Sequence, residues 1–257
     1  MGSLEGRVAV VTGASAGIGA AVVGALVREG ARVVANARRK EKLDELAGQV
    51  GGGVEVVAGD AAEPAVVGAV LERARAAFGR EADLVVANAG RGLNGSVLTS
   101  DVGQWEEMIR VNVLGAAHLM RAAGRRMLAQ SEGKTGAGLV DAARDIVVIG
   151  SVVGRHVSPF SSMYGGTKFN VHGMVEGVRR ELGPKGVRVT LVEPGFVVSE
   201  FQGVAGYDPK WFDEVVARIG PVLTPEDVAR MVVFVASQPP AVHVSDVLIR
   251  PTRQDYP

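Results

Sequence analysis

The stretch that decides the fold is Thr12 to Gly19, which reads T-G-A-S-A-G-I-G. The run before it, Arg7 to Val11, is short and rich in β-branched residues, as expected of a buried strand. The segment after it, Ala20 to Glu29, has the composition of a helix and stops at Gly30. A strand that leads through a glycine-rich turn into a helix presents backbone N–H groups and a positive helix end to a phosphate.

The glycines of this turn, Gly13, Gly17 and Gly19, follow the pattern G-x-x-x-G-x-G. This pattern is a relative of the G-x-G-x-x-G fingerprint of dinucleotide-binding proteins. A glycine-rich turn can also occur without a ligand. The strand before the turn and the helix after it favour nucleotide binding over that alternative.

Outward from this turn, the chain alternates between strand-like and helix-like segments. Strands are predicted at residues 31–36, 54–58, 83–87, 145–150, 187–192 and 244–249, and helices at about 63–78 and 101–130. The alternation predicts an α/β protein with a doubly wound parallel sheet of the Rossmann type, about seven strands and helices on both faces. No internal repeat or linker divides the chain, so we expect a single domain over residues 1–257. The polar, glycine-rich residues 131–144 are predicted to form a surface loop.

The composition argues against several function classes. Lysine plus arginine and aspartate plus glutamate both number 28, so no basic excess points to nucleic acid or to an anionic membrane. The chain has no cysteine, which excludes disulfides and thiolate metal sites, and no cluster of His, Asp and Glu has metal-ligand spacing. The first residues do not follow a signal-peptide pattern, and no apolar run approaches the roughly 20 residues of a spanning helix. We therefore expect a cytoplasmic protein without a metal.

The end of the second predicted strand bears on the choice of cofactor. In dinucleotide folds an acidic residue at this point binds the adenosine ribose, whereas an arginine accommodates a 2′-phosphate. This chain reads Asn36-Ala37-Arg38-Arg39, with two arginines and no acid. Guanidinium is a good planar partner for a phosphate, so the pattern favours NADP(H) over NAD(H). Alternatively, both arginines begin the solvated face of the next helix, which the charged residues 40–42 support.

Polar residues also follow later predicted strands. Asp60 follows the third strand, Asn88 the fourth and Ser151 the fifth, and ligands of such sheets bind at the carboxyl ends of the strands. Asp60 could accept a hydrogen bond from an adenine amino group or cap a helix. Asn112 lies among apolar neighbours. Since a buried asparagine is costly without a hydrogen bond, we expect it to have a structural or catalytic partner.

Tyr164 and Lys168 stand four residues apart, so on a helix they are neighbours on one face. A free tyrosine titrates near pH ~10. A nearby ammonium favours the phenolate and can lower that pKa by roughly 1–3 units, so such a pair can move a proton at neutral pH. Taken alone the spacing is weak evidence, because a half-buried tyrosine beside a solvated lysine is common.

Taken together, these motifs resemble the short-chain dehydrogenase/reductase family from Arg7 to about Ile249. They stand in the family's order: T-G-x-x-x-G-I-G at residues 12–19, Asn88-Ala89-Gly90, Asn112, Ser151, Tyr164-x-x-x-Lys168 and Pro194-Gly195. Ser199 stands where the family often has threonine, and the 131–144 loop is longer than in most relatives. The ending I-R-P-T-R-Q-D-Y-P lacks the glycine-rich end of many relatives. It is similar to the branch that contains NADP-dependent 3-hydroxy acid and serine dehydrogenases.

The resemblance implies a role for each matched residue. Tyr164 would be the general acid and base, and Lys168 would bind the nicotinamide ribose and lower the tyrosine pKa. Ser151 would hold the substrate oxygen, and Asn112 would position a water in the proton relay. The implied cofactor site comprises Gly13, Ser15, Gly17, Ile18, Gly19, Arg38, Arg39, Asp60, Asn88, Ala89, Gly90, Tyr164, Lys168, Pro194, Gly195, Val197 and Ser199.

The resemblance also implies a substrate lid over about residues 196–222. Five aromatic residues stand here: Phe196, Phe201, Tyr207, Trp211 and Phe212. They predict either an apolar wall for a ketone or secondary alcohol of moderate size or rings that pack the lid onto the body. Val153, Phe160 and Met163 would add apolar surface, whereas His156 is expected to be an ordinary loop histidine.

The resemblance therefore implies an NADP(H)-dependent oxidoreductase, a carbonyl reductase that interconverts a ketone or aldehyde and an alcohol. The alternative is a catalytically silent nucleotide-sensing or scaffold protein on the same fold, against which the complete catalytic set argues. A small-molecule substrate and a homotetramer are expected. The helices near 105–128 and 164–182 carry many small and apolar residues suited to packing between subunits.

Overall fold

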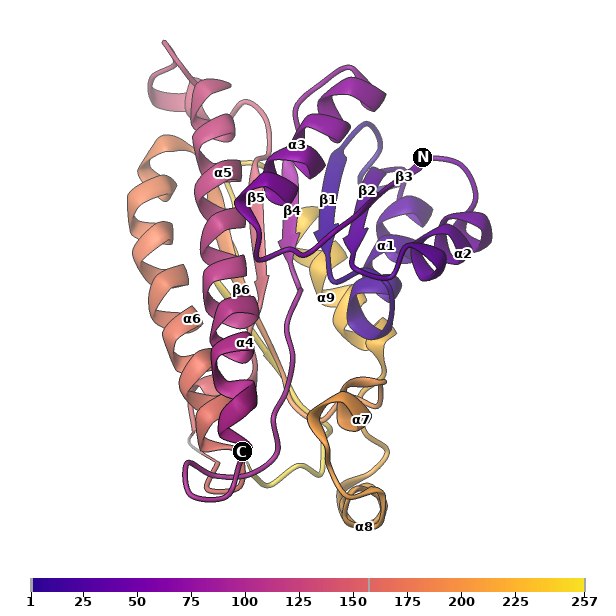
Figure 1. The fold of residues 1–257 in the computed structure, drawn as a ribbon. Helices are drawn as coiled ribbons and strands as arrows, with labels where there is room; N and C mark the ends of the chain where they lie inside the picture. The colour runs from indigo at the N-terminus through magenta and orange to yellow at the C-terminus, as the bar shows by residue number, and fades with distance from the viewer. Residues whose placement is uncertain (1, 157, 257) are drawn as a thin grey trace.

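A computed structural model describes residues 2–156 and 158–256 of the chain (Figure 1). Its seven strands form one parallel sheet in the order β3-β2-β1-β4-β5-β6-β7. The predicted fold class is confirmed. The strands are β1 (Val8–Thr12), β2 (Arg32–Ala37), β3 (Val54–Ala58), β4 (Leu84–Ala87), β5 (Asp145–Ile149), β6 (Arg188–Pro194) and β7 (Asp246–Ile249).

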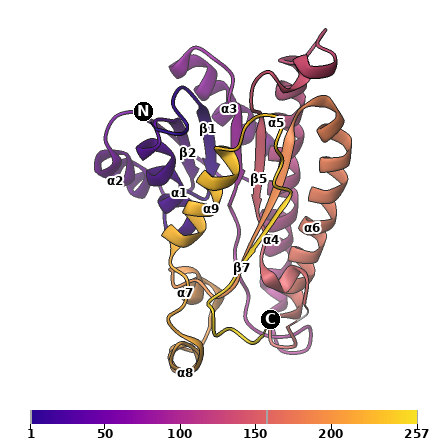
Figure 2. The same cartoon turned by 180° about the vertical axis from the view of Figure 1, so that it is seen from behind.

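Helices cover both faces of the sheet. They are α1 (Gly17–Arg28), α2 (Lys40–Val50), α3 (Pro64–Phe78), α4 (Trp105–Ile109), α5 (Ala116–Ala129), α6 (Ser162–Leu182), α7 (Phe201–Ala205), α8 (Pro209–Ile219) and α9 (Pro225–Ala236). One buried cluster joins α1, α2 and α9 to the sheet, and a second joins α3, α5 and α6 to the opposite face. Figure 2 shows α1 and α9 side by side on the first face.

Strand β1 shows why the sequence builds this arrangement. Its five residues are all buried, with Ala9 and Val11 in the first cluster and Val8 and Val10 in the second. Successive side chains of a strand point to opposite faces. A strand with helices on both sides is therefore apolar at every position.

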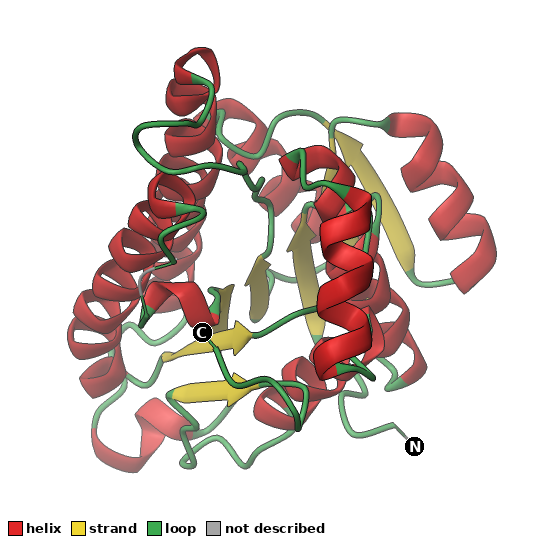
Figure 3. Ribbon diagram, turned by 90° about the horizontal axis from the view of Figure 1, so that it is seen from below, coloured by secondary structure: helices red, strands yellow, loops and turns green. Residues whose placement is uncertain are grey.

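The carboxyl ends of the strands point to the lower edge of the molecule in Figure 1, where α7 and α8 lie apart from the two helical layers. Figure 3 looks onto this edge from below. The segment containing α7 and α8 follows β6, and its helices have local start signals. The Asp208 carboxylate accepts a hydrogen bond from the N–H of Lys210 at the start of α8. Thr224 and Asp227 form a capping box at the start of α9.

Two local predictions need correction. The predicted helix over about 101–130 is interrupted by a π-helical segment, Arg110–Gly115, between α4 and α5. The 131–144 loop is not wholly on the surface, because Ser131 and Arg144 at its two ends are buried. Arg144 donates hydrogen bonds to the carbonyls of Leu139 and Ala142, and these bonds fold the loop back onto the sheet.

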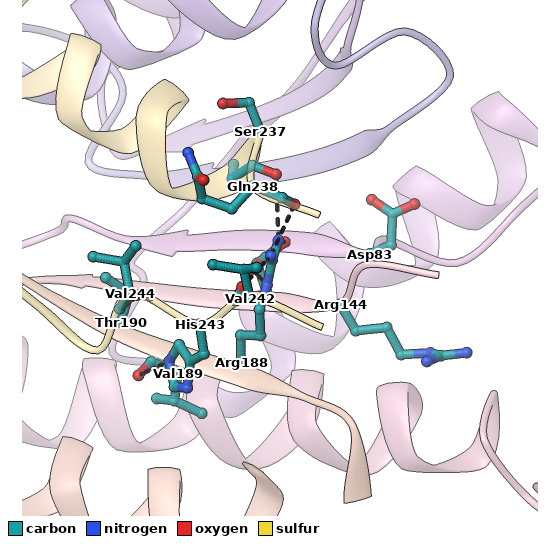
Figure 4. A network of polar contacts seen from close by, with 12 residues as sticks. Asp83, Arg144, Arg188, Val189, Thr190, Ser237, Gln238, Val242, His243 and Val244 are labelled. Carbon is teal, nitrogen blue, oxygen red and sulfur yellow. Dashed lines mark hydrogen bonds and ion pairs between the residues drawn. The ribbon is translucent and has the colours of Figure 1, made fainter. Parts of the chain in front are cut away.

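A buried ionic network lies at the amino-terminal ends of the strands, the end of the sheet opposite the one described above. Asp145 on β5 pairs with Arg7 at 2.7 Å and with Arg188 on β6 at 2.6 Å. Arg188 also donates to the carbonyls of Gln238 and Val242 in the connection from α9 to β7, which Figure 4 shows from close by. This network fixes the connection at the end of the sheet away from α7 and α8.

No helix in the described part of the chain is long and apolar enough to cross a membrane. Likewise, no group of three or more metal-ligating side chains comes together among the described residues.

Candidate functional site

A cavity of about 770 Å³ opens at the carboxyl ends of the strands. It brings together nearly all of the residues singled out from the sequence, although they span almost 190 positions of the chain. Those that line it are Gly13, Ser15, Gly17, Ile18, Arg38, Arg39, Asp60, Asn88, Ala89, Gly90, Ser151, Tyr164, Lys168, Pro194, Gly195, Val197 and Ser199. Gly19 and Asn112 are buried behind the wall.

At one end of the cavity the glycine-rich turn forms a cradle of main chain. Gly13 has a φ of +67° and Gly17 a φ of +54°, values that favour glycine. A Cβ at Gly13 would lie 2.8 Å from the Cα of Ala89. Helix α1 then begins without a side-chain cap, so its first N–H groups are available to an anion. The turn therefore fits a phosphate.

Asn88 holds this cradle from the side of β4. Its Nδ2 donates to the carbonyl oxygens of Thr12 at 3.0 Å and Gly13 at 3.1 Å. A Cβ at Gly19 would lie 2.6 Å from the same Nδ2, which explains why the third glycine of the pattern is needed although it does not reach the cavity. Asn88 thus shapes the turn through its main-chain contacts.

The two arginines after β2 both lie on the cavity wall. Arg38 is 70% exposed at its side chain and lies 3.4 Å from Glu107. Arg39 donates to the hydroxyl of Ser15 in the glycine-rich turn and pairs with Glu200 at 3.1 Å. The Arg39 side chain therefore folds over the turn instead of extending along the solvated face of α2.

The Asp60 carboxylate accepts a hydrogen bond from the N–H of Ala62 at 2.9 Å. It also forms an ion pair with Arg110 at 2.5 Å. Partial burial opposes ionisation, but these two donors hold the pKa of Asp60 below its ordinary value. The N-cap residue of α3 is Glu63. The suggestion that Asp60 caps that helix is therefore wrong, and it closes a tight turn after β3 instead.

At the other end of the cavity, Tyr164 and Lys168 lie on the first turns of α6, as their spacing predicts. Tyr164 forms a hydrogen bond with Ser151. The Lys168 Nζ donates to the carbonyl of Ile149 at 2.9 Å and lies 5.8 Å from the centre of the Tyr164 ring. A hydroxyl, a phenol and an ammonium group thus converge where β5 ends.

The resemblance implies a lowered pKa for Tyr164, whereas its pKa here lies above the ordinary value. Burial raises the pKa of Tyr164, and nearby Tyr207 adds to the rise, while the hydrogen bond to Ser151 opposes it. Burial also lowers the pKa of Lys168 to about 8. Both groups are therefore shifted toward their neutral forms, because burial of a side chain disfavours its charged form.

Asn112 lies in the π-helical segment and has the hydrogen-bond partners that its burial requires. Its Oδ1 accepts from the N–H of Arg91 at 2.8 Å, and its Nδ2 donates to the carbonyl of Arg91 at 2.9 Å. The same Nδ2 donates to the Thr167 hydroxyl at 3.0 Å. Asn112 therefore joins the chain after β4 to α6, between Tyr164 and Lys168.

The aromatic residues after β6 line the cavity and also pack on one another. The ring centres of Tyr207 and Trp211 are 5.4 Å apart, and those of Phe201 and Tyr164 are 5.6 Å apart. Phe196 and Phe212 belong to the same wall. Val153 and Phe160 also line it, whereas Met163 packs beneath, and exposed His156 does not contribute.

Sequence reasoning missed the part of the wall that comes from the end of the chain. Gln254 is buried, and its Oε1 accepts from the N–H of Phe196 at 3.0 Å. Tyr256 lines the cavity. Asp255 pairs with Arg218 of α8 at 2.9 Å. No local pattern in the sequence could reveal contacts between segments about 35 to 60 residues apart.

The chain matches the short chain dehydrogenase family over residues 7–208. It is 34% identical over 249 residues to an uncharacterized oxidoreductase of Staphylococcus aureus strain MW2, covering 96% of this chain and 98% of the relative. An uncharacterized oxidoreductase of Staphylococcus saprophyticus is 34% identical over 255 residues, covering 98% of this chain and all of the relative.

Solved structures agree with these matches. The closed form of a serine dehydrogenase complexed with NADP+ superposes with a TM-score of 0.86 at 29% identity, covering 97% of each chain. A 3-ketoacyl-(acyl-carrier-protein) reductase from Brucella melitensis complexed with NADH has a TM-score of 0.84 at 26% identity, covering 97% of this chain and 99% of that one. An alcohol dehydrogenase of Thermococcus sibiricus complexed with 5-hydroxy-NADP has a TM-score of 0.81 at 26% identity, covering 98% and 99%.

Proposed function

The chain belongs to the short-chain dehydrogenase family and is an oxidoreductase of that type, and on this premise we propose that it interconverts a ketone or aldehyde and an alcohol with NADP(H). The observation that carries the proposal is the convergence of Ser151, Tyr164 and Lys168 at one end of a cavity whose other end is a phosphate cradle. A bound nicotinamide dinucleotide would extend from the phosphate cradle at one end of the cavity to these three residues at the other. When bound, it supplies or accepts the hydride.

In this proposal Tyr164 is the general acid and base. Its Oη gives a proton to the carbonyl oxygen of the substrate in reduction and takes it back in oxidation. Ser151, already hydrogen-bonded to Tyr164, holds the same oxygen with its Oγ. Lys168 holds the nicotinamide ribose, and its ammonium charge favours the phenolate when Tyr164 has lost its proton.

The preference for NADP(H) rests on the two arginines. Arg38 and Arg39 lie on the cavity wall with no acidic residue at the end of β2. Arg39 also contacts Ser15 of the proposed phosphate cradle, so this cation would lie beside the ribose of a bound cofactor. The serine dehydrogenase with NADP+ and the alcohol dehydrogenase with 5-hydroxy-NADP support this choice, while the reductase with NADH shows that the fold also accepts the other cofactor.

The remaining residues on or behind the cavity wall would also contact the cofactor or the substrate. Asn88, Ala89 and Gly90 would support the cofactor along β4, and Asp60 would lie at the adenine end. Asn112, whose polar atoms already hold Arg91 and Thr167, would position a water of the proton relay. Residues 194 to 199 would line the nicotinamide end. Residues 196–222 would act as a lid, with an aromatic wall suited to an apolar ketone or secondary alcohol of moderate size.

We also propose that the protein is a cytoplasmic homotetramer related in substrate to the branch of 3-hydroxy acid and serine dehydrogenases. The similarity to the solved serine dehydrogenase supports the branch. Exposed apolar residues on α4, on the π-helical segment and on α6 support assembly.

Replacing Tyr164 with phenylalanine tests the mechanism. Removing a general acid and base lowers the rate by about 10²–10⁴-fold, so turnover should nearly vanish while the affinity for NADPH stays unchanged. The measurement is NADPH absorbance against a panel of ketones, aldehydes and secondary alcohols, with cofactor binding followed by fluorescence.

The matched control is Tyr207→Phe, which removes another tyrosine hydroxyl from the wall of the same cavity and should lower turnover less than about tenfold. Undiminished turnover by Tyr164→Phe would overturn the mechanism. A wild-type protein that binds NADPH but turns over none of the panel would favour a nucleotide-sensing protein.

A further inference from the structure

The loop that carries Ser151 is held from behind by three polar side chains, here called the rear cluster: buried Glu193, half-buried His172 and exposed Arg155. Glu193 on β6 is fully buried. Arg155, just after the loop, pairs with it through two hydrogen bonds of 2.6 Å each. The His172 Nδ1 lies 3.4 Å from the same carboxylate. None of the three lines the cavity.

His172 is seated inside the curve of the Ser151 loop. It stands four residues after Lys168 on α6, so both side chains project from one face of the helix. A Cβ at Gly150 would lie 2.5 Å from its Nε2, and a Cβ at Gly154 would collide with the ring. The glycines on both sides of Ser151 therefore make room for the imidazole.

The hydrogen bonding fixes which nitrogen of the ring carries the proton. The main-chain N–H of Ser151 donates to Nε2 at 3.4 Å, so Nε2 must be an unprotonated acceptor. In a neutral imidazole the proton then lies on Nδ1, which faces the Glu193 carboxylate. The Glu193 carboxylate beside Nδ1 thus favours the tautomer in which Nε2 can accept the hydrogen bond from the main-chain N–H of Ser151.

The charges around the ring favour this neutral form. Lys168 on the same helix and Arg155 on the loop oppose a positive ring, while Asp246 on β7 and Glu193 on β6 favour it. Burial, with the two cations, lowers the pKa of His172 to about 4. At neutral pH the Nε2 acceptor is therefore present in nearly every molecule.

We propose that His172 is a positioning residue of the reaction, which holds the main chain of Ser151 so that its hydroxyl meets the substrate oxygen, and that Glu193 sets its tautomer. This inference rests on the proposed function for its catalytic part. Its structural part, the Nδ1–H tautomer that accepts from Ser151, stands independently. His172 does not line the cavity, so in this proposal it acts through Ser151.

Three substitutions at His172 separate the hydrogen bond from the packing. His172→Gln keeps an acceptor at the position of Nε2. His172→Asn places its amide at the position of Nδ1 and cannot reach Ser151. His172→Phe keeps a ring between Gly150 and Gly154 without any acceptor. Each variant is compared with the wild-type protein for kcat, KM and NADPH affinity.

We expect kcat to fall about tenfold in His172→Phe and His172→Asn, the effect of one lost hydrogen bond at a positioned group. His172→Gln should stay within about threefold of wild type, and NADPH affinity should change less than about twofold in all three. An unchanged kcat in His172→Phe overturns the proposal. So does a glutamine variant as slow as the phenylalanine one, or a loss of NADPH affinity that matches the loss of kcat.

Nitrogen NMR of the imidazole tests the structural part without any turnover. The ring of His172, assigned by its absence from His172→Gln, should show the Nδ1–H tautomer and remain neutral at pH 5.5. An Nε2–H tautomer, or a ring charged at pH 5.5, overturns the inference even if the enzyme is active. A wild-type protein without turnover would refute the proposed function and the catalytic part, while the Nδ1–H tautomer would still uphold the contact with Ser151.

Discussion

Arg38 stands at the point where an acidic residue would recognise a ribose without a phosphate. Its guanidinium is 70% exposed and lies 3.4 Å from Glu107, a separation too long for a strong ion pair. A mostly solvated guanidinium has a small desolvation penalty, and it remains able to bind a phosphate through two hydrogen bonds. At the residue scale, in the proposed assignment, one or two side chains therefore decide the choice of cofactor.

Replacing Arg38 with aspartate should weaken NADPH binding about 10–100-fold, since it replaces a charge-assisted contact with a repulsion. NADH, which lacks the 2′-phosphate, should lose less than about threefold. Fluorescence titration with both cofactors measures the two affinities. Lys40→Asp is the matched control, because Lys40 is also exposed and already pairs with Asp44 at 2.6 Å. Equal losses for both cofactors would refute the assignment of the 2′-phosphate to Arg38.

Burial explains the ionisation of the site at the same scale. The pKa of Tyr164 is raised and that of Lys168 is lowered to about 8, both mainly because the two side chains are buried. A tyrosine with a raised pKa keeps its proton until a group that accepts it arrives. The proposed acid in the reduction direction is therefore protonated at neutral pH.

At the element scale, α6 organises the site. Tyr164 and Lys168 line the cavity from its first turns, Thr167 between them accepts from Asn112, and His172 supports the Ser151 loop. The π-helical segment adds one residue to a turn of the neighbouring helix and brings Asn112 to α6. Such segments are often found at functional sites. The amino-terminal ends of β5 and β6 are held together elsewhere, by the hydrogen bonds and the ion pair of Arg188. These bonds, here called the Arg188 anchor, join β6 to β5 and to the connection between α9 and β7.

Removing that anchor tests its contribution to stability. Arg188→Ala would leave Asp145 with one partner fewer and several partly buried carbonyls without this donor. Loss of one partner from a buried ion pair costs about 3–5 kcal/mol, measured as the free energy of unfolding in urea. The control is Arg180→Ala, whose side chain is 74% exposed beside Glu176; it should cost no more than about 1 kcal/mol. Similar losses in both variants would contradict the role of burial.

At the scale of the whole molecule, the apolar surface is distributed unevenly. Ile109, Leu114 and Phe169 are exposed on α4, on the π-helical segment and on α6. These elements flank one another on one face of the protein. Large apolar side chains that share an exposed face are typical of an interface between subunits.

Placing a charge on this face should prevent assembly. Phe169→Glu would bury a carboxylate without a partner in the proposed tetramer, so light scattering should show a smaller assembly than for wild type. Leu98→Glu is the control, because Leu98 is also exposed and apolar but lies on a loop outside these helices. An unchanged mass for Phe169→Glu, or a monomeric wild type, would argue against the proposed interface.

The sequence by itself determined the class of fold, the approximate bounds of the strands, the phosphate turn and the spacing of Tyr164 and Lys168. Each of these is encoded within a short segment. Apolar periodicity depends on adjacent residues, a glycine turn on its own φ values, and a pair four residues apart on the pitch of one helix. The order of these segments along the chain was sufficient for the resemblance to the family.

Only the tertiary structure decided what lies behind and around those motifs. It brought Glu193 and His172 to the rear of Ser151, Gln254 to the chain after β6, and Arg39 over Ser15. It also showed that burial raises the pKa of Tyr164, where the resemblance implies a lowered one. These features depend on contacts between residues 20 to 60 positions apart and on exclusion of water. Neither arises until the sheet and its helices have packed together.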